Sequence, residues 1–164
     1  MTMKKLIQLL SVCLLPFVTI AASTSPPPVF QMRLVLDVAV GDCDCDDMVL
    51  VHKRGDTSQK EMLHVQHLVL LNQSALKSAT VTTNQPDGSP RIEIAFTDEG
   101  KKRFAEVTRQ SIGKRLAIVI GGQLYSAPKI MTEISGGTAA ISGSFSQQEA
   151  TELVAKITES IEKR

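Results

Sequence analysis

The first sites at which this sequence could perform chemistry are two Ser-x-x-Lys spacings, Ser126 with Lys129 and Ser74 with Lys77. On a helix, this spacing places a lysine amine one turn from a serine hydroxyl, as serine acyl-transfer enzymes require. Pro128 has no amide hydrogen and stands between two strand-like segments, so the first pair is not expected to be helical. Neither pair is accompanied by a Lys-Thr-Gly motif, and four-residue matches are often accidental. We therefore expect no catalytic residue and no enzyme.

Two cysteines, Cys43 and Cys45, could bind a metal ion or act as thiols. In an extended segment both sulfurs lie on one side, and His52, His64 or His67 could complete a tetrahedral zinc site. Cys-x-Cys is not the usual zinc spacing, however, and His64 and His67 would point to opposite faces of a strand. The favoured interpretation is an exposed acidic turn whose thiols are joined to each other, joined to another chain, or reduced. We predict no metal and no cofactor, with a metal- or thiol-dependent protein as the alternative.

Composition excludes several classes of partner. The 164 residues include 18 basic and 17 acidic side chains, a formal net charge of +1, so no strong field attracts nucleic acid or an anionic membrane. Aromatic residues are 4% of the chain with no Trp, which leaves no platform on which bases could stack. The glycine pairs lack the spacings of phosphate-binding loops and are typical of turns. We expect no nucleic-acid partner.

The N-terminus has the pattern of a secretory signal peptide. Met1 to Lys5 contains two lysines, Leu6 to Ile20 is almost wholly apolar, and Ala21 to Ser23 supplies small residues for cleavage. The apolar run is shorter than the roughly 20 residues that cross a bilayer as a helix. We expect a signal peptide (1–23), a proline-rich linker (24–30) and one domain (31–164). The mature chain would be periplasmic or secreted without a membrane span; an uncleaved N-terminal anchor is the alternative.

Alternating apolar residues predict several hairpins. In the first half, a strand from Met32 to Val40 is expected to pair with one from Met48 to His52, followed by a polar loop, Lys53 to Glu61. A short strand over Met62 to Gln66 and a helical turn over Asn72 to Lys77, capped by Asn72, come next. Thr80 to Thr83 and Arg91 to Phe96 flank an Asn-Gln-Pro-Asp-Gly-Ser-Pro turn and form another hairpin.

Two amphipathic helices follow. Thr97 is expected to cap a helix from Asp98 to Ile112, with Gly113 beyond its end. The last helix begins with the capping-box pair Ser146 and Glu149 and keeps apolar residues on one stripe. Between the helices, two hairpins are predicted: Leu116–Ile120 with Gln123–Ser126 around Gly121 and Gly122, and Ile130–Ile134 with Thr138–Ser142 around Gly136 and Gly137. This order predicts an α+β domain, a mostly antiparallel sheet of hairpins with two helices packed on one face.

The second half of the chain also carries a family resemblance. The segments "FTDEGKKRFAEVTRQSIGKRLAIVIGGQLYSAPKI" and "ISGGTAAISGSFSQQEATELVAKI" share several features, in the same order, with the head part of the first periplasmic domain of SecD, an accessory subunit of the bacterial Sec translocase. These are the Phe-Thr-x-x-Gly helix entry, Gly-Lys-Arg-Leu-Ala-Ile-Val, the Gly-Gly turn, Ser-Ala-Pro, Ile-Ser-Gly-x-Phe and the Glu-Ala helix. The resemblance covers Phe96 to Ile157.

The resemblance implies an extracytoplasmic α+β domain that contacts an emerging polypeptide and moves relative to the base of the same periplasmic region. SecD also has six membrane helices whose acidic residues couple proton flow to that movement. We recognise neither these helices nor a base subdomain in this sequence, so we expect a non-catalytic binding head. Its partner would be a polypeptide or protein, with components of the Sec translocase as candidates, bound at a sheet edge or an apolar groove. In this family Pro128 would end strand pairing, and Ser126 would form a local hydrogen bond.

Overall fold

The structure, a computed structural model, describes residues 28–36, 43–54, 57–84 and 87–163. The expected signal peptide, most of the linker and the end of the first expected strand lie outside these residues. The elements in chain order are β1 (Phe30–Leu36), β2 (Cys45–Arg54), β3 (Thr57–Gln66), β4 (Leu71–Asn72), the 3₁₀ turn η1 (Gln73–Ala75), β5 (Leu76–Thr83), β6 (Pro90–Phe96), α1 (Asp98–Gln110), β7 (Leu116–Ile120), β8 (Gln123–Ser126), β9 (Thr138–Ser142) and α2 (Gln147–Glu162).

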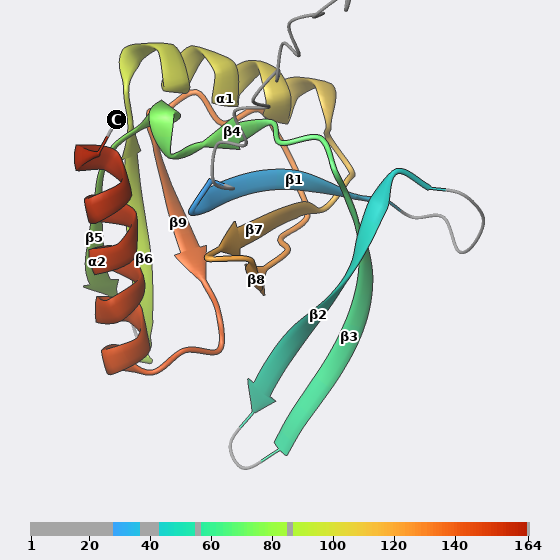
Figure 1. Cartoon of the computed structure of the whole chain (residues 1–164), viewed down its shortest axis with the longest axis vertical. Coiled ribbons are helices and arrows are strands. Elements are labelled where there is room, and N and C mark those ends of the chain that lie inside the picture. Colours follow the sequence, from blue (N-terminus) through green and yellow to red (C-terminus); the bar gives the residue numbers. More distant parts are fainter. Residues whose placement is uncertain (1–27, 37–42, 55–56, 85–86, 164) are drawn as a thin grey trace, which may run out of the picture.

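The described strands form two antiparallel sheets. The larger has the order β2-β3-β1-β7-β8, with β4 paired to β1, and the smaller has the order β5-β6-β9. In Figure 1, α2 runs along the smaller sheet and α1 lies across one end of the molecule. The predicted α+β class with two helices is therefore confirmed, while the hairpins belong to two sheets where one was expected.

Two hydrophobic cores follow from this arrangement. The main core lies between the sheets and the helices and includes Phe30, Met32, Ile94, Phe104 and Ile157. A second, smaller core lies on the opposite face of the larger sheet: Val35, Leu50, Leu63, Val65, Ala117, Val119, Leu124 and Ala127. Because β1 and β7 contribute to both cores, β7 is buried at all five positions. This explains why its sequence, Leu-Ala-Ile-Val-Ile, is apolar without alternation.

The predicted pairing of the first two strands is wrong. The Lys53 to Glu61 segment is not a loop, because β2 pairs with β3 along ten positions, from Cys45↔Gln66 to Arg54↔Thr57. This long hairpin projects from the body (Figure 1). Ser58, Gln59 and Lys60 are exposed, and a two-stranded ribbon in water does not need the apolar alternation that identifies a buried strand. β1 instead pairs with β7 on one edge and with β4 and the end of β3 on the other.

The predicted hairpin after the second glycine turn is also wrong. β9 pairs with β6, and the segment that was expected to be its partner, Ile130 to Ile134, forms no strand. This segment is instead hydrogen-bonded to the end of α1 and the start of β7: the amide of Ile134 donates to Thr108 Oγ1 at 2.9 Å, and the amide of Ile130 donates to the carbonyl of Lys114 at 2.8 Å.

Both helices begin with a side-chain cap. Thr97 Oγ1 accepts a hydrogen bond from the amide of Gly100 at 3.0 Å. At α2, Ser146 Oγ accepts from the amide of Glu149 at 3.2 Å, and Glu149 Oε2 accepts from the amide of Ser146 at 2.6 Å. These bonds satisfy amide groups that have no partner inside a helix. Asn72 Oδ1 similarly accepts from the amide of Ser74 at 2.9 Å and begins η1, the short helical turn predicted there.

Candidate polypeptide-binding groove

An apolar groove of about 410 Å³ lies between the two sheets, beside the end of α1. Its lining comes from five parts of the chain: Met32 of β1, Phe104 of α1, Leu116 and Ile118 of β7, Pro128 to Thr132 with Ile134 in the segment after β8, and Thr138, Ala139 and Ala140 of β9. Ile134, which lies in this lining, is 37% exposed. The apolar lining of the groove is therefore partly open to solvent.

Met131 is the most exposed large apolar side chain among the described residues, with 75% of its surface accessible. It lines the groove together with Ile134. An isolated exposed apolar residue needs no explanation, but several around one concave surface are typical of interaction sites. Methionine also adapts its shape to varied partners, because its chain is unbranched and flexible.

The wall that carries Met131 is fixed by backbone hydrogen bonds. The amide of Leu116 donates to the carbonyl of Pro128 at 2.9 Å, and the amide of Gly113 donates to the carbonyl of Ile130 at 2.8 Å. An isolated bridge also joins Arg115 to Lys129. Hydrogen bonding to the segment that leads into β7 therefore continues beyond Pro128 and holds this wall of the groove against the larger sheet.

β9 forms one side of the groove and has a free edge. It pairs with β6 from Arg91↔Ser142 to Ala95↔Thr138, and no other strand of the described chain pairs with it. An edge strand leaves alternate backbone amides and carbonyls unpaired, and an extended peptide can bond to them. The groove therefore combines apolar side-chain contacts with a strand edge, the two features that recognise extended polypeptides.

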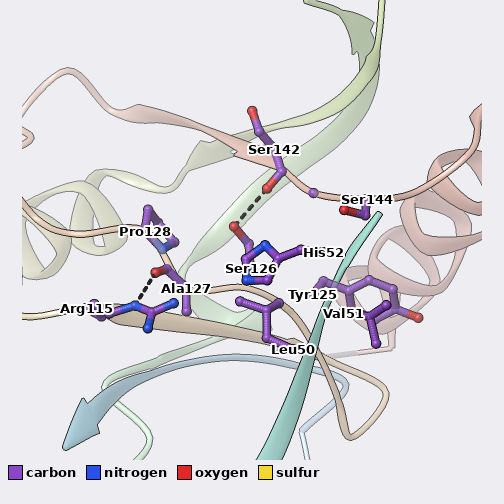
Figure 2. Close-up of a pocket in the computed structure, with 11 residues that line it drawn as sticks. Leu50, Val51, His52, Arg115, Tyr125, Ser126, Ala127, Pro128, Ser142 and Ser144 are labelled. Carbon is purple, nitrogen blue, oxygen red and sulfur yellow. Dashed lines mark hydrogen bonds between the residues drawn. The ribbon is translucent and has the colours of Figure 1, made fainter. Parts of the chain in front are cut away.

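Ser126 has a structural contact. Its hydroxyl donates to the carbonyl of Ser142 at 2.8 Å and so links the end of β8 to the end of β9. The neighbouring carbonyl of Ala127 accepts from Arg115 Nε at 2.9 Å (Figure 2). The bond of Ser126 crosses 16 positions of sequence and joins the two sheets, where the resemblance implied a local bond.

The second Ser-x-x-Lys pair is divided between two elements. Ser74 lies in η1 and its hydroxyl donates to Asn72 Oδ1 at 2.6 Å, whereas Lys77 lies in β5. The one-turn helical spacing that would bring the lysine amine over the hydroxyl is therefore absent from this pair. Lys77 is exposed.

Cys43 and Cys45 form a disulfide with their Cα atoms 5.3 Å apart. Oxidised sulfurs are not thiolate ligands, and the three histidines contact carboxylates instead. His64 Nδ1 lies 2.6 Å from Asp47 Oδ1, and His52 Nε2 lies 3.1 Å from Glu61 Oε2. In the described part of the chain, no group of three or more His, Cys, Asp or Glu side chains is arranged to hold a metal ion.

His67 bridges two carboxylates at the base of the hairpin. Its Nδ1 lies 2.5 Å from Asp44 Oδ1, and its Nε2 lies 2.8 Å from Asp46 Oδ1. These contacts, first with Asp44 and then with Asp46, raise the pKa of the imidazole. Asp46 also pairs with the buried Arg33 at 2.7 Å, which with His67 lowers the pKa of the Asp46 carboxyl. The cluster attaches the start of β2 to β1 and to the end of β3.

The glycines of the predicted turns lie at the ends of the elements that build the groove. Gly121 and Gly122 form the β7–β8 turn with positive φ angles of 58° and 81°, a conformation that costs little without a side chain. Gly113 follows α1 and Gly137 precedes β9, with φ angles of 88° and 84°. Gly136, beside it, has no positive φ.

A family model described as "SecDF, P1 head subdomain" matches residues 48–160. The SecDF translocase subunit of Thermus thermophilus is 54% identical over 66 residues, 40% of this chain and 9% of that protein. The SecD subunit of Calditerrivibrio nitroreducens is 35% identical over 118 residues, 69% of this chain and 23% of that protein. The SecD of Leptotrichia buccalis is 46% identical over 85 residues, 52% of this chain and 21% of that protein.

Solved structures agree. A crystal structure of SecDF in a super-membrane-facing form superimposes with a TM-score of 0.62 at 31% identity, over 79% of this chain and 18% of that one. The structure of SecDF as a membrane component that enhances protein export superimposes with a TM-score of 0.60 at 31% identity, over 79% of this chain and 61% of that one. The chain spans less than a quarter of the length of each of the three curated relatives named above. Where the structure describes the chain, no helix is long and apolar enough to cross a bilayer. The chain belongs to the SecDF P1 head subdomain family.

Proposed function

We propose that this protein is a non-catalytic, extracytoplasmic binding module that assists protein export by holding extended segments of polypeptides in the groove beside β9. One observation carries the proposal: Met131, 75% exposed, and Ile134 line an apolar groove that is bordered by a free strand edge. The apolar N-terminal segment and the SecD resemblance support a location in the periplasm or outside the cell.

Family membership supports a role in export. A SecDF of known structure, similar over 79% of this chain, is described as enhancing protein export. The relatives are translocase subunits much longer than this chain. Binding of the polypeptide by a head domain is the step of export that requires neither a membrane nor an energy source. Translocase components are accordingly the protein partners we propose.

The physical properties of the groove suit a chain in transit. Apolar side chains buried in it contribute about 25 cal/mol for each Å² removed from water, whichever apolar residue is bound. The edge of β9 bonds to backbone groups, which every sequence has. Together these contacts give sequence-tolerant and modest affinity, whereas a specific enzyme substrate requires convergent polar groups.

The serine and cysteine side chains that could act as nucleophiles are held in hydrogen bonds or in a disulfide, which supports a role without catalysis. Ser126 donates its hydroxyl to the carbonyl of Ser142, Ser74 bonds to Asn72, and Cys43 is joined to Cys45. Each of these contacts is part of the fold and leaves the side chain occupied.

The test is binding of a fluorescent synthetic peptide with alternating leucine and threonine to the purified protein, followed by anisotropy. Met131→Asp places a charge in the groove and should weaken binding by roughly tenfold or more, because a carboxylate must then lose its hydration. Met62→Asp is the matched control, since Met62 is also exposed, at 60%, but lies on β3 outside the groove. Equal affinities for the two variants would contradict the proposed site.

The export role is tested by placing a photo-crosslinking amino acid at Met131 in exporting cells, and at Met62 for comparison. Crosslinks to a defined secretory precursor arrested in transit should form from position 131 and not from position 62. If neither position captures the precursor while the peptide still binds in solution, the groove binds polypeptides but the role in export is wrong.

A further inference from the structure

Thr108 is a fully buried residue near the end of α1 whose hydroxyl bonds to two parts of the chain. Its Oγ1 donates to the carbonyl of Phe104, one turn earlier in the helix, at 2.8 Å, and also lies 3.1 Å from the carbonyl oxygen of Ala105. The same oxygen accepts from the amide of Ile134 at 2.9 Å, across 26 positions of sequence. Thr108 therefore connects α1 to the wall of the groove beside β9.

The two kinds of bond are compatible because a threonine hydroxyl has one hydrogen and two lone pairs. The hydrogen of Thr108 is directed to the helix carbonyls, as is common for threonines inside helices. A lone pair is then left for the amide of Ile134. Because the branched side chain is stiff at χ1, the acceptor is held in one place. Valine has nearly the same shape and offers neither a donor nor an acceptor.

The wall segment, residues 131–134, is fixed at its two ends. At the first end, the amide of Ile130 donates to the carbonyl of Lys114 at 2.8 Å. At the second end, the amide of Ile134 bonds to Thr108. Within the described residues, Met131 to Glu133 form no hydrogen bond, and all four residues of the segment are exposed. The second end of the wall therefore depends on one hydroxyl.

The floor of the groove is linked to the same turn of α1. Phe104 lines the groove, and its carbonyl accepts the hydrogen bond of Thr108. Ile134 also lines the groove, and its amide bonds to the same hydroxyl. The separation between an apolar floor residue and an apolar wall residue is thus set through Thr108.

We propose that Thr108 is a positioning residue for polypeptide binding, which holds the wall with Met131 and Ile134 at the distance from Phe104 at which an extended chain fits. Thr108 is buried and does not line the groove itself, so it acts through the amide of Ile134. The inference rests on the proposed function, since it concerns the same groove.

Loss of this bond loosens the wall and removes no apolar surface from the groove. One neutral hydrogen bond shifts an equilibrium by roughly twofold to tenfold. A ligand that requires the attached wall is weakened according to the fraction of protein in which the wall is detached. The freed amide can bond to water, because Ile134 is 37% exposed. We therefore expect Thr108→Val to weaken binding while the protein stays folded.

Three variants test this expectation with the fluorescent leucine-threonine peptide. Thr108→Val should bind it roughly twofold to tenfold more weakly than the parent protein, whereas Thr108→Ser keeps the hydroxyl and should bind nearly as the parent does. Thr151→Val is the matched control, because Thr151 Oγ1 donates to the carbonyl of Gln147 at 2.9 Å, the same one-turn bond, on α2 outside the groove. Urea denaturation shows whether each variant is folded.

Met131 reports the wall directly in protein without peptide. In protein labelled with ¹³C at the methionine methyl groups, Thr108→Val should move the resonance of Met131 toward its random-coil position. The resonance of Met62, which lies on β3 outside the groove, should not change. An unchanged Met131 resonance would mean that the wall does not depend on the hydroxyl, and would overturn the proposal.

A change on the other side of the bond tests whether the hydroxyl acts through Ile134. The α-hydroxy acid counterpart of isoleucine, incorporated at position 134, replaces the amide N–H by an ester oxygen and keeps the side chain. This variant should weaken binding as much as Thr108→Val does. The combined variant should bind no more weakly than either alone, because both changes remove the same bond. Additive losses would contradict the proposed route.

The peptide measurements also separate this inference from the proposed function. If the parent protein does not bind the leucine-threonine peptide, the proposed function is wrong and the positioning role is wrong with it. If the parent protein binds the peptide and Thr108→Val binds it equally well, the groove remains the binding site and only the role of Thr108 is wrong.

Discussion

Glu61 and Arg115 form a two-pronged ion pair that fastens the β2–β3 hairpin to the body of the protein. Arg115 Nη1 lies 2.6 Å from Glu61 Oε1, and Nη2 lies 3.1 Å from Oε2. Arg115 immediately precedes β7, and its Nε also donates to the carbonyl of Ala127. The guanidinium thus connects β3 with the segment after β8, next to the start of β7.

The strength of this pair can be measured by a double-mutant cycle with Glu61→Gln and Arg115→Gln. Glu61 and Arg115 are 40% and 28% exposed, so solvent screens the charges and the coupling should be near the upper end of about 0.2–1 kcal/mol. Chemical denaturation gives the four free energies of unfolding. A coupling within error of zero would mean that the paired geometry does not stabilise the hairpin.

The same pair predicts an acid-dependent loss of stability. The guanidinium of Arg115, and then the contact with His52, lower the pKa of Glu61 from 4.5 to about 2. Because the pKa is lowered, the ionised carboxyl contributes its full stabilisation at pH values above 4.5. This contribution disappears as the pH falls through about 2. The difference in stability between the parent and Glu61→Gln proteins should therefore be constant above pH 4.5 and shrink below it.

Both proteins in that comparison should carry His52→Gln, so that Arg115 is the remaining partner that lowers the pKa of Glu61. A difference that grows on acidification would contradict the assignment.

For His67 we predict the opposite dependence of stability on pH. Asp44, and then Asp46, raise the pKa of His67 above 6.5, so its contribution is present below the ordinary pKa and is lost as the pH rises through the raised value. Comparison of His67→Gln with the parent protein between weakly acidic and alkaline pH should show a stability difference that decreases with increasing pH. The pKa itself can be read from the imidazole resonances by NMR titration. A value at or below 6.5 would contradict the contacts described.

Local signals in the sequence predicted the helices and failed at the hairpin. Thr97 and the Ser146–Glu149 pair act over a few residues, and their effect does not depend on the rest of the fold. The base of the β2–β3 hairpin packs in the second core, but its outer part pairs exposed polar residues such as Ser58 to Lys60, and Glu61 is bonded to a partner 54 positions away. Alternation of apolar residues cannot indicate such a contact. The Gly55-Asp56 dipeptide between the two strands was the available signal.

The groove was only partly predictable. A binding surface at a sheet edge or apolar groove was expected, but Ile130 to Ile134 was predicted to be a strand that pairs with Thr138 to Ser142 around Gly136 and Gly137. The amides of Ile130 and Ile134 bond instead to Lys114 and to Thr108. The exposure of Met131 depends on these contacts between distant segments. Assigning β9 to β6 likewise requires knowledge of which hairpins share a sheet.

Removing the cap of α2 should destabilise the protein without changing its fold. Ser146→Ala removes the acceptor for the amide of Glu149 and should lower the free energy of unfolding by about 1 kcal/mol. Ser146→Asp retains an acceptor at the same position and should lose much less. Thermal or urea unfolding compares the two variants, and equal losses would show that the hydroxyl is not the stabilising group.

Gly100 lies in the first turn of α1, directly against the backbone of Ala75, where a side chain would not fit. A Cβ atom at this position would lie 2.1 Å from the carbonyl oxygen of Ala75 and 2.9 Å from its carbon. The same carbonyl accepts a hydrogen bond from the amide of Thr97 at 2.9 Å. The first turn of α1 therefore packs directly onto the backbone of η1, at a distance that only glycine permits.

Gly100→Ala tests this contact against helix propensity, since the two effects have opposite signs. Alanine is favoured over glycine inside a helix by about 0.8–1.0 kcal/mol, whereas forcing extra atoms into a packed site costs about 1–3 kcal/mol. Because the obstructing atoms belong to the backbone and cannot rotate away, we expect the steric cost to exceed the gain and the free energy of unfolding to fall. Gly136→Ala is the matched control, with no atom within 4 Å of the added Cβ and no positive φ. An increase in stability for Gly100→Ala, measured by urea denaturation beside the control, would show that α1 can move off η1 at little cost.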